Sequence, residues 1–189
     1  MRTKILVLIS ALLLPGSFAS QASTPDSADV SQISMLEASA AAGDEKAQLN
    51  LARRYLVGSG VEADTNKSII YYRLAAERGI AFAQHQLGLI YLSGQYLEPD
   101  PAAAERWLLQ AAHLGYRPAQ LDLSDYYATG MADAPLLVPS LQWLLIAESL
   151  GEAGLSDRIE ELNSQMTYLQ RAEATLLARL CILRGYSDC

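Results

Sequence analysis

The sequence predicts an all-α fold, an α/α solenoid of about three full helix-pair repeats with capping helices at both ends. The first observation behind this prediction is that the dipeptide Ala-Gln recurs every 36 residues, at Ala47, Ala83 and Ala119. The second is that leucine follows each alanine after four residues, tyrosine after eight and glycine after eleven. These columns are Leu51, Leu87 and Leu123, then Tyr55, Tyr91 and Tyr127, and then Gly58, Gly94 and Gly130. A period of this size is typical of stacked supersecondary units rather than of one globular core.

The second half of each unit repeats as well, with an aromatic residue at offset 24 from the alanine, alanine at 28 and glycine at 32. These columns are Tyr71, Trp107 and Trp143, then Ala75, Ala111 and Ala147, and then Gly79, Gly115 and Gly151. In the first half, apolar or small residues at offsets zero, four, five and eight share one face of a helix. Each unit is therefore predicted to contain two helices.

Residues 1–19 are predicted to be a secretory signal peptide, because two basic residues precede a short apolar stretch and then small residues. Cleavage after Ala19 or after Ala22 would satisfy the small-residue requirement. The apolar run is short for a bilayer-spanning helix, which needs about 20 residues, and an uncleaved anchor is the alternative. No lipobox cysteine follows Gly16. We therefore expect a periplasmic or secreted protein rather than a lipoprotein.

The segment after the signal peptide is expected to hold a tail and then half a repeat. Residues 20–26 are expected to be a flexible N-terminal tail, and residues 27–43 an N-terminal capping helix. Met35, Ser39 and Gly43 fall in the aromatic, alanine and glycine columns of a preceding unit. Only the second helix of that unit is therefore expected.

The next two units are repeat 1, residues 47–82, and repeat 2, residues 83–118. The glycine at offset eleven should end the first helix, because a residue without Cβ tolerates the left-handed backbone found there. The second helix should begin at Asp64 and at Asp100. An aspartate side chain accepts from free N–H groups, and the proline after Asp100 suits the first helical position.

Repeat 3, residues 119–152, is degenerate. It has Leu136 in place of the aspartate, and Pro139 three residues later. This difference predicts either an altered loop or a second helix that begins later.

Residues 153–189 are expected to form C-terminal capping helices, the first over residues 153–163. Thr167 and Gln170 have the spacing of a capping box that would start the last helix. That helix should run to about Leu183, and Gly185 should stop it.

Two kinds of column have an expected packing role. Small residues at offset five, together with the alanines at offset 28, should let the helices approach closely; the former are Ala52, Gly88 and Ser124. The tyrosine and tryptophan columns should fill the wedge between neighbouring helix pairs. Each ring would then be buried only because the next pair is present.

The unit reads A-x-x-x-L-[small]-x-x-Y-x-x-G, then Asp, an aromatic residue and A-A-x-x-G, and it resembles the Sel1-like repeat. That family is an α/α solenoid related to tetratricopeptide repeats. The best matches are AQLNLARRYLVGSGVEAD (47–64) with YYRLAAERG (71–79), and AQHQLGLIYLSG (83–94) with WLLQAAHLG (107–115). The resemblance covers about residues 33–151. It implies a protein-interaction scaffold, and because exported bacterial members commonly serve envelope assemblies, it implies a role in motility, secretion, polysaccharide export or binding of host proteins.

The first helix of each repeat should present its remaining side chains, at offsets −1, two and six, on the concave face that stacked pairs offer to partners. These candidate partner-binding residues are Lys46, Leu49, Arg53, Phe82, His85, Leu89, Pro118, Leu121 and Asp125. Leucines at an open position favour binding, since a scaffold with no partner gains nothing by exposing them. The alternative is that these leucines take part in ordinary packing between helices.

Catalytic and metal sites are not expected. Neither His85 nor His113 has a metal-ligand partner four residues on or a nearby Cys or Asp cluster. His113 is expected to be structural, and Asp122 and Asp125 are expected to be solvated acids. No nucleophile motif, phosphate loop or dinucleotide fingerprint occurs, so we expect no enzyme and no cofactor.

Charge and cysteine content limit which partners and which compartment are expected. The net charge is −7, or −9 without residues 1–19, which carry two of the fourteen basic residues and no acidic one. Without clustered Lys and Arg, nucleic acid is not an expected partner. Cys181 and Cys189 fit an oxidising compartment. A chain reversal at Gly185 would let them pair, and the alternatives are an intermolecular bridge or a buried free Cys181.

The sequence therefore predicts an exported scaffold, without chemistry of its own, that docks another envelope or secreted protein on its concave face. No membrane insertion is expected after signal cleavage, and the oligomeric state stays open. Relatives with a disulfide in every repeat have been linked to penicillin binding, so one alternative is a hydrolase or penicillin-binding activity, although no repeat here contains cysteine. The second alternative is a structural subunit that stacks end to end.

Overall fold

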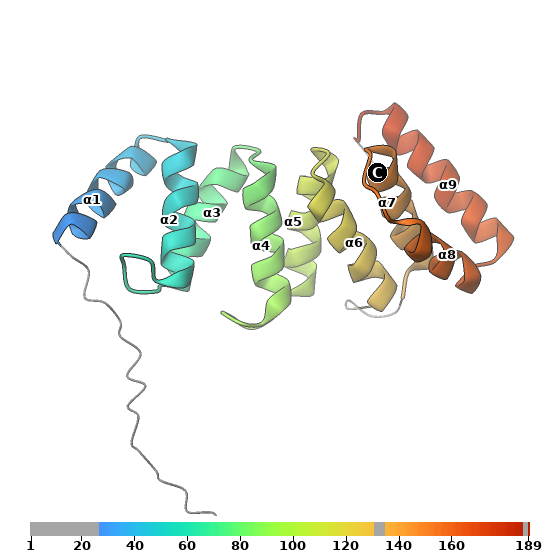
Figure 1. Ribbon diagram of the computed structural model, residues 1–189, viewed down its shortest axis with the longest axis horizontal. Helices are drawn as coiled ribbons and strands as arrows, with labels where there is room; N and C mark the ends of the chain where they lie inside the picture. The colour runs from blue at the N-terminus through green and yellow to red at the C-terminus, as the bar shows by residue number, and fades with distance from the viewer. Residues whose placement is uncertain (1–26, 131–134, 187–188) are drawn as a thin grey trace, which may run out of the picture.

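The structure is a computed structural model that describes residues 27–130, 135–186 and 189. The expected signal peptide and tail, residues 1–26, lie outside the described residues. Figure 1 shows the described part of the chain as a row of helices with no strand among them, which confirms the all-α solenoid. The helices are α1 (Ser27–Ala41), α2 (Glu45–Val57), α3 (Thr65–Glu77), α4 (Ala81–Ser93), α5 (Pro101–His113), α6 (Arg117–Thr129), α7 (Leu137–Ser149), α8 (Ser156–Gln165) and α9 (Tyr168–Leu183).

The first helices of the repeats, α2, α4 and α6, end at the predicted glycines. Gly58, Gly94 and Gly130 have φ of +74°, +60° and +67°, the left-handed region that a side chain makes unfavourable. The second helices also begin where predicted in repeats 1 and 2. The Asp64 and Asp100 side chains accept from the backbone N–H groups of Lys67 and Ala103, at 3.0 and 2.8 Å.

The second helix of repeat 3, α7, begins in register, so the expectation of a later start is wrong. Leu136 offers no side-chain cap, but its backbone N–H donates to the carbonyl of Tyr127 at 2.8 Å. The same backbone bond joins Asp64 to Tyr55 and Asp100 to Tyr91, at 2.7 and 2.9 Å. This bond fixes the start of the second helix in all three repeats. Loop residues 131–134 lie outside the described residues.

The Gln of each Ala-Gln dipeptide links one helix pair to the next. The buried side chains of Gln48, Gln84 and Gln120 donate from Nε2 to carbonyls eight residues earlier, at 3.0, 3.0 and 3.2 Å. The acceptors are Ala40, Ala76 and Ala112, each the penultimate residue of the preceding helix. Carbonyls at a helix C-terminus lack a partner within their own helix. Each of these three carbonyls also accepts from the backbone N–H of the glycine three residues later, at 2.9–3.0 Å, so the glutamine adds a second bond that holds consecutive helices together.

Small residues at offset five allow the two helices of each pair to touch, as predicted. The Ser68 and Ser140 hydroxyls donate to the carbonyls of Ala52 and Ser124, at 2.7 and 2.9 Å. In repeat 2 a Cβ at Gly88 would lie 2.6 Å from Cγ of Leu108 and 3.4 Å from the carbonyl of Ala104. Only glycine fits there without displacing the neighbouring helix.

The core is a chain of apolar clusters, each shared by neighbouring helices. One joins α1 to α2, the next joins α2, α3 and α4, a third joins α5, α6, α7 and α9, and the last joins α7, α8 and α9. The aromatic column takes part in these clusters. Tyr71 packs against the first two and stacks on Tyr55 at 5.9 Å between ring centroids, Trp107 is half-buried, and Trp143 is buried.

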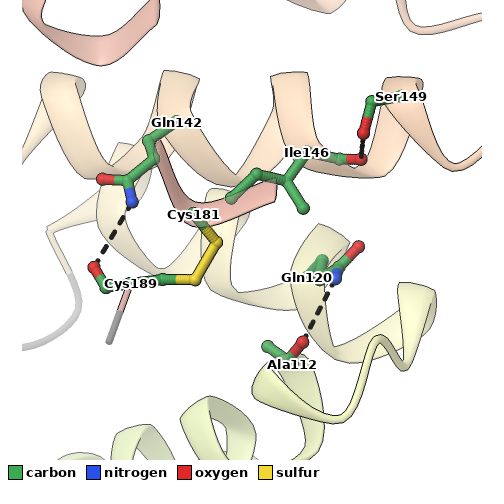
Figure 2. Close-up of a disulfide and its surroundings, with 7 residues drawn as sticks. All are labelled: Ala112, Gln120, Gln142, Ile146, Ser149, Cys181 and Cys189. Atoms are coloured by element: carbon green, nitrogen blue, oxygen red, sulfur yellow. Dashed lines mark hydrogen bonds between the residues drawn. A yellow bond between two sulfur atoms is a disulfide. The ribbon is translucent and has the colours of Figure 1, made fainter. Parts of the chain in front are cut away.

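The C-terminal segment folds back onto the last repeat. The predicted capping box of Thr167 and Gln170 starts α9, whereas α8 lies slightly later in the chain than the predicted 153–163. Cys181 and Cys189 are joined by a disulfide, and the buried Gln142 of α7 donates to the Cys189 carbonyl at 3.3 Å (Figure 2). The intrachain pairing is therefore the one the structure contains. It ties the end of the chain back to α9, and the Gln142 bond joins that end to α7.

Candidate protein-binding face

We use "first-helix strip" for the nine candidate binding residues of α2, α4 and α6, namely Lys46, Leu49, Arg53, Phe82, His85, Leu89, Pro118, Leu121 and Asp125. The helices that carry them lie on one side of the row in Figure 1, with α3 and α5 behind. The structure divides this strip into a part on α2 and α4, where Lys46, Arg53 and Leu89 are exposed and which we call the open part, and a part on α6 that contacts α8. The two parts differ in their contacts and in charge.

The open part centres on a groove along α2 with a volume of about 520 Å³. Lys46 and Arg53 are exposed there, and the half-buried Leu49 forms its apolar floor. The full lining is Lys46, Leu49, Asn50, Arg53, Arg54, Val57 and Ser59. This lining holds three cationic side chains and no carboxylate, although the whole chain has a net charge of −7.

Arg53 is held in place by aromatic neighbours. Its guanidinium lies over the Phe82 ring, 4.6 Å from the centroid, which is a cation–π geometry between α2 and α4. Burial raises the pKa of Tyr72, and the hydrogen bond and charge of Arg53 oppose that rise. Phe82 and Tyr72 thus support the arginine from below while its charge stays accessible.

Two of the three strip leucines take part in packing between helices, and partner binding by the strip stays a prediction. Leu49 packs against the cluster of α2, α3 and α4, and Leu121 packs against the cluster of α7, α8 and α9. Leu89 stays exposed, at 36%. It borders a small depression of about 160 Å³ that also contains Leu56 and Tyr96. Of the three leucines, Leu89 therefore offers the most accessible apolar surface.

His85 departs from the expectation that it lies open on the strip. Its side chain is buried, its Nε2 lies 2.6 Å from Oδ2 of Asp122, and its ring is 5.3 Å from that of Tyr116. Asp122 comes from the next repeat, 37 residues away, so no local sequence pattern predicts this contact. The pair joins α4 to α6, so Asp122 is not a free solvated acid. The His85–Asp122 pair marks the end of the open part of the strip.

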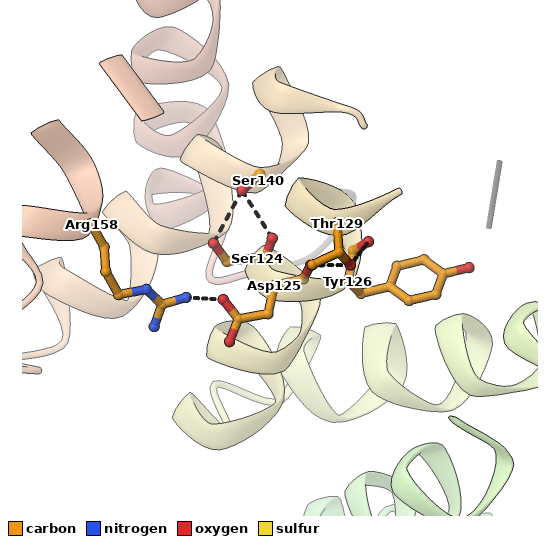
Figure 3. Close-up of polar contacts among 6 residues, drawn as sticks. All are labelled: Ser124, Asp125, Tyr126, Thr129, Ser140 and Arg158. Atoms are coloured by element: carbon orange, nitrogen blue, oxygen red, sulfur yellow. Dashed lines mark hydrogen bonds and ion pairs between the residues drawn. The ribbon is translucent and has the colours of Figure 1, made fainter. Parts of the chain in front are cut away.

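The α6 part of the strip contacts α8. Arg158 of α8 donates to Asp125, as Figure 3 shows, while the Asp125 side chain stays 60% exposed, so the expected solvated carboxylate is also an ion-pair partner. Burial raises the pKa of Asp125, and the Arg158 charge opposes that rise. Leu121 packs against the same cluster as Ile159 and Leu162 of α8. The 36-residue period carries no signal for this contact, because α8 lies beyond the last unit.

Outside the first-helix strip, the sequence predicted a structural His113, no metal site and no membrane insertion. His113 packs against Trp143 with 5.7 Å between ring centroids, in keeping with a structural role. Across the residues that the structure describes, no three His, Cys, Asp or Glu side chains come together as a metal site would require. In the same residues, no helix has the length and apolar character needed to cross a membrane.

Comparison with known proteins identifies the family. The model of the Sel1 repeat matches residues 45–80 and 81–116, the two repeats whose strip is open. A Sel1 repeat protein from Oxalobacter formigenes, known from its crystal structure, is 33% identical with a TM-score of 0.60; the match covers 69% of this chain and 98% of that one.

A second solved structure extends the likeness. It is c5321, a protective antigen present in uropathogenic Escherichia coli strains and displaying an SLR fold, with 28% identity and a TM-score of 0.69. The match covers 82% of this chain and 34% of that one, so this chain spans about a third of that protein's length. The comparison with curated proteins gave no match. From the 36-residue helix pairs and these likenesses together, the chain belongs to the Sel1 repeat family.

Proposed function

We propose that this protein is an exported scaffold that captures a segment of another envelope or secreted protein on the open part of its first-helix strip. Sel1 repeat solenoids are in general non-enzymatic scaffolds suited to protein–protein interaction. The observation that carries the finer proposal is the α2 groove, where Lys46, Arg53 and Arg54 surround an apolar floor without any carboxylate.

The chemistry of this groove favours an acidic segment that also carries apolar side chains. Complementary charge raises association rates and selects among partners, whereas apolar contacts supply most of the affinity. Val57 is 70% exposed beside the cations, and Leu89 extends the apolar surface onto α4. The His85–Asp122 pair and the ion pair of Arg158 with Asp125 interrupt the strip beyond this point. The expected footprint is therefore short, about two repeats long.

Export rests on the character of residues 1–19 and on the disulfide. Cystine bonds persist mainly in oxidising compartments, and Cys181 is bonded to Cys189. The proposed compartment is therefore the periplasm or the extracellular medium, and the proposed setting is an envelope assembly of the motility, secretion or polysaccharide-export type. Recovery of a chain shortened at its N-terminus by the signal peptide from those fractions checks this part; a full-length chain confined to the cytoplasm would contradict it.

A random peptide display library selected on the purified protein tests the binding proposal. We expect enriched peptides with Asp or Glu beside a large apolar residue. They should bind the Lys46→Glu/Arg53→Glu variant at least tenfold more weakly, because the variant reverses the groove charge.

The control variant is Arg106→Glu/Arg171→Glu, which makes the same charge change at exposed positions of α5 and α9. Binding should survive in this control. Peptides without acidic residues, or equal loss in both variants, would show that the groove does not select the partner.

A further inference from the structure

The last helix, α9, exposes an unusual amount of apolar surface. One face docks on the body of the protein through Ala174, Ala178 and Cys181, which are all buried. The exposed large apolar side chains of the same helix are Tyr168 (77%), Leu169 (77%), Leu176 (58%), Leu177 (37%), Leu180 (37%) and Leu183 (82%). Soluble proteins seldom leave such side chains gathered in one place unless something binds there.

The spacing gathers these leucines on one face. Leu169, Leu176 and Leu183 are seven residues apart, and Leu180 lies four residues after Leu176. At about 100° per residue they form one stripe, opposite the docked face. We call this stripe, with Leu177 at its edge, the α9 leucine face.

Helix α9 lies at the end of the row of helices (Figure 1), where a capping element normally presents a polar surface. The other end is less apolar, because Met35, at 66%, is the one large apolar side chain exposed among residues 31–41 of α1. The disulfide after α9 and the Gln142 contact hold the helix against α7. The leucines are thus presented on a fixed helix, so little entropy is lost when they pack against another surface.

We propose that the α9 leucine face is a homodimer interface, in which two copies of this chain pair their α9 helices antiparallel about a two-fold axis near Arg179. In this register Leu176 of each copy meets Leu183 of the other, and Leu177 meets Leu180, so that one stripe supplies both halves of every contact. Such self-complementarity is what an isologous interface requires.

The charges around the stripe agree with this register. Glu173 falls at the rim, opposite Arg184 of the second copy, so that unlike charges meet outside the leucines. The two Arg179 side chains face one another across the axis at the solvent edge, which costs some affinity. A parallel arrangement would instead align Glu173 of both copies.

The area predicts a weak dimer. Each leucine face and its flanking residues offer on the order of 500 Å², so pairing buries about 1,000 Å², the lower limit for a specific interface. We therefore expect dissociation in the micromolar range. Because each copy has a net charge of −7 and the arginines face one another, added salt should strengthen the dimer.

Sedimentation equilibrium on the purified protein between about 1 and 200 μM tests the proposal. We expect a reversible monomer–dimer equilibrium, and a shift of at least tenfold toward monomer in Leu176→Glu/Leu180→Glu with unchanged helical circular dichroism. The matched control, Ile70→Glu/Leu114→Glu, removes two apolar side chains that are 55% and 56% exposed outside α9. It should dimerise like the parent.

Cross-linking tests the register independently of folding effects. Both native cysteines are in the disulfide, so Arg179→Cys adds one reactive thiol per copy at the proposed axis. A short bismaleimide should link it into a dimer, whereas Arg106→Cys, at an exposed position of α5, should stay monomeric.

Three results would overturn the proposal. They are a monomer at every concentration, a dimer that Leu176→Glu/Leu180→Glu leaves intact, and growth without a limiting size, which would mean end-to-end stacking. Binding of the monomer to anionic vesicles, lost in Leu176→Glu/Leu180→Glu, would assign the face to a lipid surface instead.

Discussion

The tyrosine column of the repeats has a polar role as well as an apolar one. Tyr55 and Tyr127 occupy the same column and are both buried, and their hydroxyls donate to the carboxylates of Glu37 and Glu105 at 2.8 and 2.5 Å. A buried hydroxyl needs such a partner, since an unpaired one costs free energy. Burial, with the hydrogen-bonded carboxylate, raises the pKa of both phenols. Packing at Tyr55 and Tyr127 therefore favours the protonated phenol.

Tyr55 makes stability sensitive to alkaline pH. Burial and Glu37 raise its pKa from 10.0 to about 12 in the folded protein. Between these values the folded chain keeps a proton that the unfolded chain has lost. The stability contributed by this group is thus fully present below pH 10 and is lost as the pH rises through 12. Tyr55→Phe should flatten the alkaline fall in the free energy of unfolding by about 1–2 kcal/mol.

Urea unfolding followed by circular dichroism at several pH values between 8 and about 11.5 measures this effect. Tyr168→Phe serves as the control, because Tyr168 is 77% exposed and should leave the pH profile unchanged. Identical profiles for Tyr55→Phe and the parent would mean that Tyr55 ionises alike in both states.

At the scale of the helix, the second helix of all three repeats starts at the same backbone hydrogen bond. The repeats differ in the side chain at the N-cap position. Leu136 has φ −109° and ψ 84°, close to Asp100 at −127° and 86°. The backbone is therefore already arranged for a capping side chain that leucine cannot supply. At 50% exposure, Leu136 also loses little contact if replaced.

Leu136→Asp should stabilise the protein by about 1 kcal/mol, because the carboxylate can accept from free N–H groups in the first turn of α7. The free energy of unfolding in urea measures the gain. Leu136→Asn should give a similar increase, and Leu136→Ala, which removes the leucine without capping, should give none. Equal effects of Asp and Ala would show that capping is not the cause.

Helix boundaries were predictable from the sequence where local chemistry decides them. Asp64, Asp100 and Thr167 begin helices, and the glycine columns end them, because caps act within a few residues. Two features of the strip were not predictable in this way. The His85–Asp122 pair and the contact of Arg158 with Asp125 join residues more than 30 positions apart. No column repeats either contact, so periodicity could not find them.

The family match also separates repeats 1 and 2 from repeat 3. The matched residues, 45–116, cover repeats 1 and 2. Repeat 3 diverges from the pattern and contacts α8 through Leu121 and Asp125. A repeat that must fit a capping helix is under different packing demands from one that does not. The loss of sequence pattern in repeat 3 thus coincides with its contact with α8.

At the scale of the whole molecule, stability passes from neighbour to neighbour. Each apolar cluster joins consecutive helices, and no cluster spans the whole row of described helices. Repeat arrays of this kind unfold most easily from their ends. The C-terminal end is secured by the Cys181–Cys189 bond, which also positions Tyr186 over Gly115, where an added Cβ would lie 3.8 Å from the ring.

Removing the disulfide should therefore loosen one end of the row and leave the middle intact. Closing so short a loop stabilises by roughly 2–3 kcal/mol on the chain-entropy model. In Cys189→Ser we expect amide hydrogen exchange to become about 30–100 times faster in α9 and α8, with little change in α3, α4 and α5. The factor follows from this free energy, because about 1.4 kcal/mol corresponds to a factor of ten when exchange follows local opening. Mass spectrometry of peptic fragments resolves these helices, and the reduced parent protein should behave like the variant. Equal acceleration along the whole chain would mean that the helices unfold as one cooperative unit, and unchanged exchange in α9 would mean that packing against α7 alone secures the C-terminal end.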